Sequence, residues 1–137
     1  MSLRVLFGMV CPDFGIPALR RPAPSNTELL KHLYDRFNAR DMEALLATMH
    51  PDVMWANGME GGHVHRHDGV RNYWMRQWAV IDPNVEPVGF TAGAGATTKV
   101  EVRQIVRDLK GKMLSDKFVD HIFRIERGLI RRFDIRN

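Results

Sequence analysis

From residue 85 onward, the C-terminal half of the sequence consists of segments with the two-residue period of β-strands and contains no helical segment. Apolar residues alternate with polar ones through Lys99–Leu109, as in a strand with one buried face. Glu126-Arg127-Gly128 separates the last two segments and is typical of a hairpin loop in which the glycine adopts a positive φ. The predicted strands of this half cover residues 85–92, 99–109, 113–125 and 129–136.

Helices are predicted before these strands. Ser25 and Glu28 have the spacing of a capping box, Asp41 can cap a second, short helix, and a third helix begins near Asp68. The predicted elements are helices at 26–40, 42–50 and 68–82, and a strand at 52–57 followed by a Gly-rich bend. Three helices followed by antiparallel strands predict an α+β fold, in which a curved sheet wraps around the helices and one cavity.

Length and composition fit one domain. The 137 residues are too few for two independent cores, and 45% hydrophobic with 26% charged residues is the balance of an ordinary globular protein. Residues 1–24 contain four prolines and are predicted to be an N-terminal extension, so the single domain spans 25–137. No apolar run is long enough for a membrane span. The one cysteine, Cys11, excludes an intrachain disulfide and predicts a cytoplasmic protein.

The charge pattern argues against nucleic acid as a partner. The formal net charge is +4, but the basic residues of the last hairpin alternate with acidic ones on the same predicted face. Nucleic-acid binding needs a stripe of one sign, often with exposed aromatic residues beside it. The residues of this mixed face are Arg124, Arg132 and Arg136 with Asp120, Glu126 and Asp134.

The register of the last hairpin decides which residues face the cavity. A three-residue loop pairs His121 with Phe133, which keeps most apolar residues opposite one another. It also pairs Phe123 with Arg131, so that His121 and Arg131 are the polar residues on an inward, apolar face. A slip of one residue would place His121 opposite Asp134 instead.

His121 is the sharpest candidate for chemistry. Burial lowers the pKa of an imidazole, so that it can act as a neutral base. A core histidine that is hydrogen-bonded to a neighbouring tyrosine or to a backbone carbonyl is the simpler interpretation. Gln104 lies on the inward face of the adjacent strand, and Asn57 shares a strand face with Trp55, so either amide can serve a ligand oxygen or a buried neighbour. The candidates for contact with a flat apolar ligand, which core packing also explains, are Trp55, Tyr34, Trp74, Trp78, Val102 and Phe133.

Three histidines alternate along one short segment. On a strand, His63, His65 and His67 would lie on one side, an arrangement found in metal sites. The segment follows a Gly-rich bend, and Asp68 is the one carboxylate directly beside it. A solvated strand is the better interpretation, and no metal or other cofactor is predicted.

Three stretches of sequence and the order of elements resemble the SnoaL-like and ketosteroid isomerase-like branch of the nuclear transport factor 2-like superfamily. The stretches are FNARDMEALLATMHPDVMW, HDGVRNYW and DHIFRIERGLIRRFDI. The resemblance covers residues 25–137 and implies a cone-shaped α+β barrel of the cystatin-like type. It also implies a small-molecule pocket inside the cone and a homodimer through the outer face of the sheet.

Residue by residue, the resemblance implies altered chemistry. Asn57 stands where ketosteroid isomerases have their Asp base, a carboxylate whose pKa is adjusted by its surroundings. His121 stands where those enzymes have a carboxylic acid and where SnoaL-like cyclases have an acid–base Asp. Leu33 falls at the isomerase oxyanion Tyr, with Tyr34 one place away. The Arg-Asp-Asp set of limonene-epoxide hydrolase-like members is replaced by Val102, Gln104 and Ile135, which excludes that mechanism.

Two hypotheses for function follow. In the first, a cofactor-independent enzyme of the isomerase or cyclase type uses His121 to move a proton next to a carbonyl of an apolar small molecule, while Asn57 and Gln104 polarise the oxygen. In the second, the same groups only orient a bound ligand, and the chain is a binding or dimerisation module. A metal site at His63, His65 and His67 is a third, weaker hypothesis.

Overall fold

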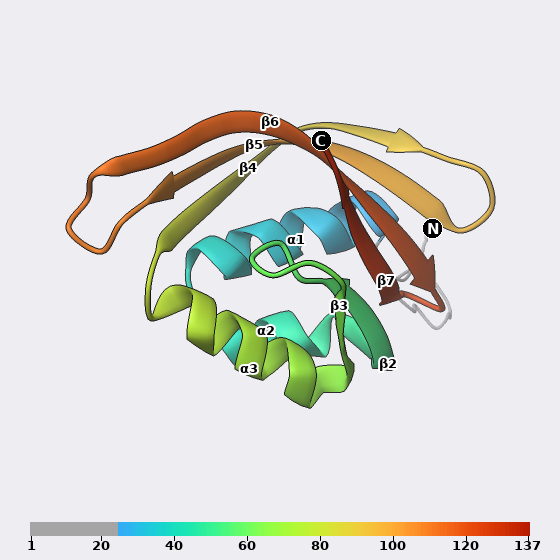
Figure 1. Cartoon of the computed structure of the whole chain (residues 1–137). Helices are drawn as coiled ribbons and strands as arrows, with labels where there is room; N and C mark the ends of the chain where they lie inside the picture. Colours follow the sequence, from blue (N-terminus) through green and yellow to red (C-terminus); the bar gives the residue numbers. More distant parts are fainter. Residues whose placement is uncertain (1–24) are drawn as a thin grey trace, which may run out of the picture.

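The computed structural model describes residues 25–137 (Figure 1). The predictions for the Pro-rich extension and for Cys11 lie outside the described residues. None of the helices from residue 25 onward is long and apolar enough to cross a membrane.

Three helices form, and the first two begin where the capping signals predict. In α1 (Asn26–Asn38), the Ser25 hydroxyl accepts the amide N–H of Glu28 at 3.1 Å, and the Glu28 carboxylate accepts that of Ser25 at 3.0 Å. This is the reciprocal capping box, which satisfies two amides of the first turn. The side chain of Asp41 accepts the amide N–H of Ala44 at the start of α2 (Met42–Ala47). The third helix, α3, spans Arg66–Trp78.

The second helix ends earlier than predicted because the chain is taken into the sheet. Thr48 closes α2, and its carbonyl accepts the amide N–H of Ile130 from the last strand at 2.8 Å. Strand β2 therefore begins at Met49 and runs to Ala56, through Pro51, instead of starting at residue 52. A long-range hydrogen bond thus overrides the helical pattern, which extends to residue 50.

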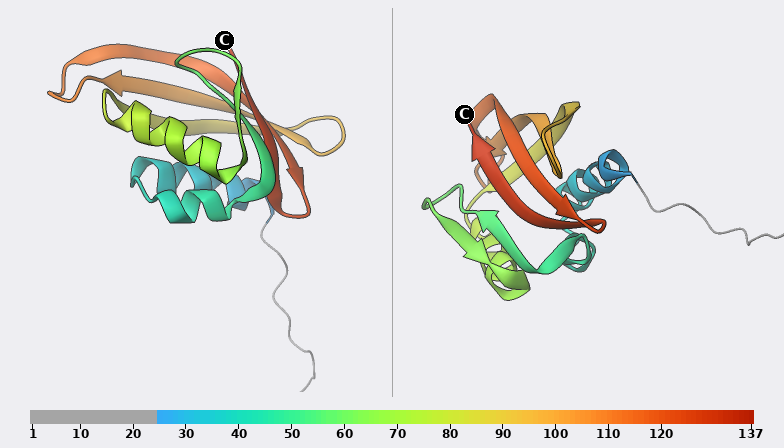
Figure 2. Two further views of the ribbon diagram at one scale, coloured as in Figure 1. Left: turned by 60° about the horizontal axis from the view of Figure 1, so that its bottom comes forward. Right: turned by 90° about the vertical axis from the view of Figure 1, so that its right-hand side faces the viewer.

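Six strands form one curved sheet over the helices (Figures 1 and 2). The order is β3-β2-β7-β6-β5-β4, and β2 and β7 run parallel while every other pair is antiparallel. The sheet is open, with β3 and β4 as its edges, and the helices lie against its concave face. The predicted α+β fold with a curved, mainly antiparallel sheet is confirmed. The other bounds are β3 (His63–His65), β4 (Asp82–Ala92), β5 (Thr97–Arg107), β6 (Met113–Glu126) and β7 (Leu129–Arg136).

The core lies between the concave face and the helices. Its fully buried large side chains come from α1, α2, α3 and the four inner strands. Each contributes on the order of 1.5–3 kcal/mol through burial, so this layer fixes the position of α1 and α3 under the sheet. The largest are Phe123, Leu30, Leu45, Met49, Ile130, Val53, Val70, Val100 and Val102.

The predicted register of the last hairpin is wrong. The loop has two residues, Arg127 and Gly128, with φ of 53° and 79°, which matches the favoured two-residue turn between twisted strands. Ile125 pairs with Ile130 and Arg124 pairs with Arg132. Arg131, between them, is therefore a bulge residue without a partner on β6.

This bulge restores the inward direction of the apolar residues. Phe123 lies opposite Phe133, and His121 lies opposite Ile135, not opposite Phe133 or Asp134. Arg131 is released from the apolar face and donates to the carbonyl of Asp52. His121 stays on the concave face and is buried. The shorter turn and the bulge thus keep the predicted face of His121 while changing its neighbour.

Candidate functional site

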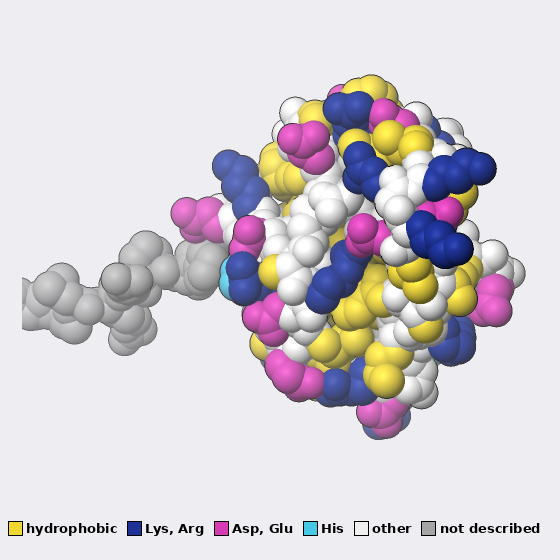
Figure 3. Space-filling model, turned by 90° about the vertical axis from the view of Figure 1, so that its left-hand side faces the viewer, with side chains coloured by type: hydrophobic (Ala, Val, Ile, Leu, Met, Phe, Trp, Pro, Cys, Tyr) yellow, Lys and Arg dark blue, Asp and Glu magenta, His cyan; other side chains and the backbone are white. Residues whose placement is uncertain are grey.

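An apolar cavity of about 150 Å³ lies between the concave face of the sheet and helices α1 and α3. Seven aromatic side chains contribute to its wall, and its polar members are the side chains of Gln77, Gln104 and His121 together with two tyrosines. Figure 3 faces one end of the molecule, where hydrophobic side chains gather in a recess with Lys and Arg side chains around it. The aromatic wall consists of Tyr34, Phe37, Trp55, Tyr73, Trp74, Phe123 and Phe133.

His121 is held in this cavity by Tyr34 from α1. The Tyr34 hydroxyl lies 2.8 Å from Nδ1 of His121, and both side chains are buried. Phe133 packs edge-on against the imidazole, with ring centroids 4.8 Å apart. The imidazole is thus fixed on three sides: by its strand, by one hydrogen bond and by an aromatic ring.

The hydrogen bond to Tyr34 is compatible with a His121 tautomer that is protonated at Nε2. The hydroxyl of Tyr34 has no other partner in the described part of the chain, so its proton is satisfied when it is donated to Nδ1. Nε2 of His121 then carries the single N–H proton of the neutral ring. That atom has no protein partner among residues 25–137, yet it is not one of the fully buried polar atoms without a partner. We infer that Nε2–H faces the cavity as a hydrogen-bond donor.

Burial keeps both members of this pair neutral. Burial lowers the pKa of His121 from 6.5 to about 3, because the protonated imidazolium would lose its hydration. Burial raises the pKa of Tyr34 above its ordinary value for the same reason. No Asp, Glu, Lys or Arg side chain from the described residues lines the cavity. At pH 7 the site is therefore an uncharged, apolar space with a neutral imidazole in its wall.

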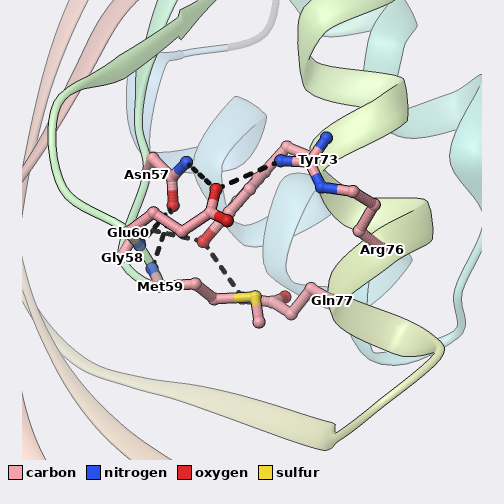
Figure 4. Close-up of polar contacts among 7 residues, drawn as sticks. All are labelled: Asn57, Gly58, Met59, Glu60, Tyr73, Arg76 and Gln77. Atoms are coloured by element: carbon pink, nitrogen blue, oxygen red, sulfur yellow. Dashed lines mark hydrogen bonds and ion pairs between the residues drawn. The ribbon is translucent and has the colours of Figure 1, made fainter.

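A second polar group in the wall was not predicted from the sequence. The hydroxyl of Tyr73 accepts the amide N–H of Gly58 at 3.0 Å and the side-chain N–H of Gln77 at 3.1 Å (Figure 4). The remaining amide oxygen of Gln77 is fully buried without a partner among residues 25–137. Tyr73 and Gln77 are four residues apart on α3, and this i, i+4 spacing is the signal that places both on one helix face.

The structure brings most of the predicted site residues to the cavity. His121, Gln104, Trp55 and Tyr34 line it, as do Trp74 and Phe133. Three predicted residues do not line it: Asn57, Trp78 and Val102. Trp78 stacks on Trp74 and lies beneath the guanidinium of Arg40, behind the cavity wall. Val102 is fully buried on β5.

Asn57 is the centre of the β2–β3 loop instead. Its side-chain oxygen accepts the amide N–H groups of Met59 at 3.0 Å and Glu60 at 2.8 Å. Its side-chain nitrogen donates to the Glu60 carboxylate, which also contacts Arg76 on α3 (Figure 4). The Asn57 amide, which was predicted to polarise a ligand oxygen, is therefore hydrogen-bonded within its own loop. A short polar side chain at the start of a Gly-rich bend is a common signal for such a turn.

The three alternating histidines have separate surroundings. Nε2 of His63 lies 2.8 Å from the Asp134 carboxylate, and Nε2 of His67 lies 3.0 Å from the carbonyl oxygen of Met49. His67 belongs to α3, whereas His63 and His65 form the ends of β3. Within residues 25–137 no three His, Cys, Asp or Glu side chains are grouped closely enough to hold a metal ion.

Comparison with known proteins supports the same fold. The chain is similar to an NTF2-like protein of unknown function from Burkholderia pseudomallei, with 26% identity, a TM-score of 0.72, and coverage of 80% of this chain and 88% of that one. TerC co-crystallised with polyporic acid gives the same identity, TM-score and coverage. A putative polyketide cyclase from Pseudomonas putida is 21% identical, with a TM-score of 0.71 over 81% of this chain and 90% of that one. No curated protein sequence matches the chain.

A family match establishes the relationship at the level of sequence. The family described as the SnoaL-like domain matches residues 30–133, which include most of α1, the whole of α2 and α3, and the strand that carries His121. The match covers most of the described domain. This chain belongs to the SnoaL-like domain family.

Proposed function

We propose that the chain binds a small molecule that places one uncharged ring in the apolar cavity and accepts a hydrogen bond from His121. The observation that carries this proposal is the Tyr34–His121 pair, which engages Nδ1 and leaves Nε2 without a partner among residues 25–137, beside an uncharged cavity. With Tyr34 as the donor to Nδ1, Nε2–H is a donor to the ligand. A dry cavity of about 150 Å³ is known to hold a molecule the size of benzene. A carbonyl oxygen on such a ring would accept the hydrogen bond from Nε2–H of His121.

Catalysis is the second candidate, and one observation favours it. When negative charge develops on a ligand oxygen, a hydrogen bond donated to it in an apolar site stabilises that charge more than the same bond does in water. Neutral His121 would therefore stabilise an enolate-like oxygen, as an enzyme of the isomerase or cyclase type requires. No other ionisable group of the described residues lines the cavity except tyrosines of high pKa, so a base for the carbon-bound proton would have to be His121 in its other tautomer. Binding needs no such change and is our first proposal.

A matched pair of probes tests the binding role. Acetophenone and α-methylstyrene have nearly the same shape, but only the first has an oxygen that can accept a hydrogen bond. We expect acetophenone to bind several-fold more tightly, because the donor at Nε2 is left unpaired by α-methylstyrene. Titrations followed by NMR measure both affinities and show whether the resonances of cavity residues shift.

The control removes the hydrogen-bonded pair as a unit. In the double variant Tyr34→Phe/His121→Leu, both partners become apolar, which avoids leaving one buried polar group alone. We expect this variant to bind the two probes equally. Failure of acetophenone to bind, or an unchanged preference in the double variant, contradicts the proposal.

We also propose that the chain is a cytoplasmic homodimer. The outer face of β6 carries exposed large apolar side chains, Leu114 and Phe118, next to the Arg103–Asp116 ion pair. Apolar surface of this kind, with charges at its border, is typical of protein interfaces. This face is separate from the apolar cavity, so dimerisation would leave the ligand site accessible.

A further inference from the structure

A second hollow adjoins the apolar cavity at the end of β7. Its volume is about 320 Å³, and it shares four wall residues with the cavity: Ala56, Gly58, Gln104 and Ile135. The rest of its wall is largely polar and includes His63, Lys117 and Asp134. We call it the polar hollow. The two spaces are neighbours of opposite character along one concave surface.

The ending of β7 explains why this hollow exists. The last register pair between β6 and β7 joins Asp120 to Arg136, so the part of β6 before Asp120 has no β7 residue beside it. Lys117 and Val119 border the polar hollow in this stretch. The loop after β2 forms the opposite wall with Asn57 and Gly58.

One strand connects the two spaces. Lys117 and His121 lie on the same face of β6, because residues four apart on a strand point the same way. At about 3.3 Å per residue, their Cα atoms are about 13 Å apart along the strand. Gln104 is the register partner of Lys117 on β5 and lines both spaces. A ligand that reaches from His121 past Gln104 therefore arrives at Lys117.

Among the charged side chains that line the polar hollow, Asp134 has cationic partners, whereas Lys117 has no partner within residues 25–137. The Asp134 carboxylate accepts a hydrogen bond from Arg132 at 2.7 Å and lies 2.8 Å from Nε2 of His63. Both partners lower the pKa of Asp134, and Arg132 has the larger effect. Lys117 has no ion pair or side-chain hydrogen bond within residues 25–137. Its ammonium group is therefore the cation left available to a ligand.

We propose that the ligand carries an anionic oxygen group, such as a carboxylate, on a chain that leaves the apolar cavity past Gln104 and ends at Lys117. This inference rests on the binding function proposed above and adds the class of ligand, a ring ketone with an acidic tail. Recognition is then divided. His121 selects the oxygen next to the ring, and Lys117 selects the charge at the other end.

Two acids of different length and their amides test this inference. The probes are 4-oxo-4-phenylbutanoate and 6-oxo-6-phenylhexanoate, each compared with its neutral primary amide, and acetophenone serves as the reference. We expect at least one of the acids to bind about fivefold more tightly than its amide at low salt, and this advantage to decrease as salt rises. The acid with the better match to the spacing of Lys117 and His121 should show the larger advantage.

Matched lysine variants locate the charge that is responsible. Lys117→Gln should abolish the advantage of the acid over the amide, while Lys110→Gln, the same change at an exposed turn outside both hollows, should preserve it. Equal binding of acid and amide, or an equal loss in both variants, overturns the inference. In either case, retained binding of acetophenone leaves the proposed function intact, whereas its absence removes the proposed function itself.

Discussion

The hydroxyl of Tyr34 and Nδ1 of His121 lie 2.8 Å apart, and the two rings are nearly parallel, with an angle of 14° between their planes. This contact joins α1 to β6 across the interior of the domain. It determines which nitrogen of the imidazole faces the cavity, and it supplies both residues with their one side-chain hydrogen-bond partner among residues 25–137. The first two predictions depend on it.

Tyr34→Phe should destabilise the domain and weaken its choice between probes. The change leaves Nδ1 of His121 buried without a donor, so we expect the free energy of unfolding to fall by about 1–3 kcal/mol. The preference for acetophenone over α-methylstyrene should also decrease, because Nε2 no longer has to carry the proton. Urea unfolding followed by tryptophan fluorescence measures the free energy of unfolding. A Tyr34→Phe protein as stable as the original would show that this hydrogen bond contributes nothing net.

Stability should decrease on mild acidification because of His121. Its pKa is about 3 in the folded chain and 6.5 for an imidazole exposed by unfolding, so between these values the unfolded chain binds a proton that the folded chain does not. Unfolding then takes up protons, and stability is lost as the pH falls below 6.5. From about pH 7 to about pH 5 we expect a loss of about 2 kcal/mol, since the folded imidazole stays neutral over this range.

His121→Gln is the control for this pH dependence. The glutamine oxygen can still accept the Tyr34 proton, but the side chain does not titrate. Urea unfolding at the same two pH values should therefore show a smaller difference for the variant than for the original protein. Parallel pH dependence in the two proteins would mean that His121 is accessible enough to be protonated when folded.

Asn57→Ala should loosen the β2–β3 loop without removing the ligand contact. The change deletes the acceptor for the amides of Met59 and Glu60, and we expect a loss of about 1–2 kcal/mol in stability. Hydrogen exchange should accelerate at these two amides, while the preference for acetophenone persists. Asn84→Ala, at an exposed asparagine of β4, is the matched control. Loss of the acetophenone preference in the Asn57 variant, but not in the Asn84 variant, would show that Asn57 takes part in ligand binding.

Phe118→Glu should separate the proposed dimer. The Phe118 side chain is 60% exposed in the single chain, so a charge at this position costs little in the monomer and much in an apolar interface. We expect sedimentation to show a dimer for the original protein and a monomer for the variant, with the same unfolding midpoint at low protein concentration. A monomer in both cases would refute the dimer.

Local signals in the sequence predicted the elements well. The capping box at Ser25 and Glu28 and the cap at Asp41 depend on neighbours within four residues, and the structure contains each of them. Strand alternation likewise predicted the inward face of Val102 and Gln104. Such features depend on chemistry close in the chain, which a single sequence displays.

Features that depend on distant partners were predicted less well. The hydrogen bond between Ile130 and Thr48 draws Met49 into the sheet, and the bulge at Arg131 changes the pairing of the last hairpin. Asn57 has the residue type of a ligand donor, yet the loop that follows it takes up its amide. No local pattern distinguishes these outcomes from their alternatives.

The sequence by itself determined the class of fold, the order of its elements and the inward direction of His121, because periodicity and capping act over a few residues. Only the tertiary structure decided that Tyr34, 87 positions away, is the hydrogen-bond partner of this imidazole, and that Lys117 borders a second space. The physical reason is that the protonation and partners of a buried group are determined by what packs around it, and in this domain those neighbours come from strands and helices far apart in the chain.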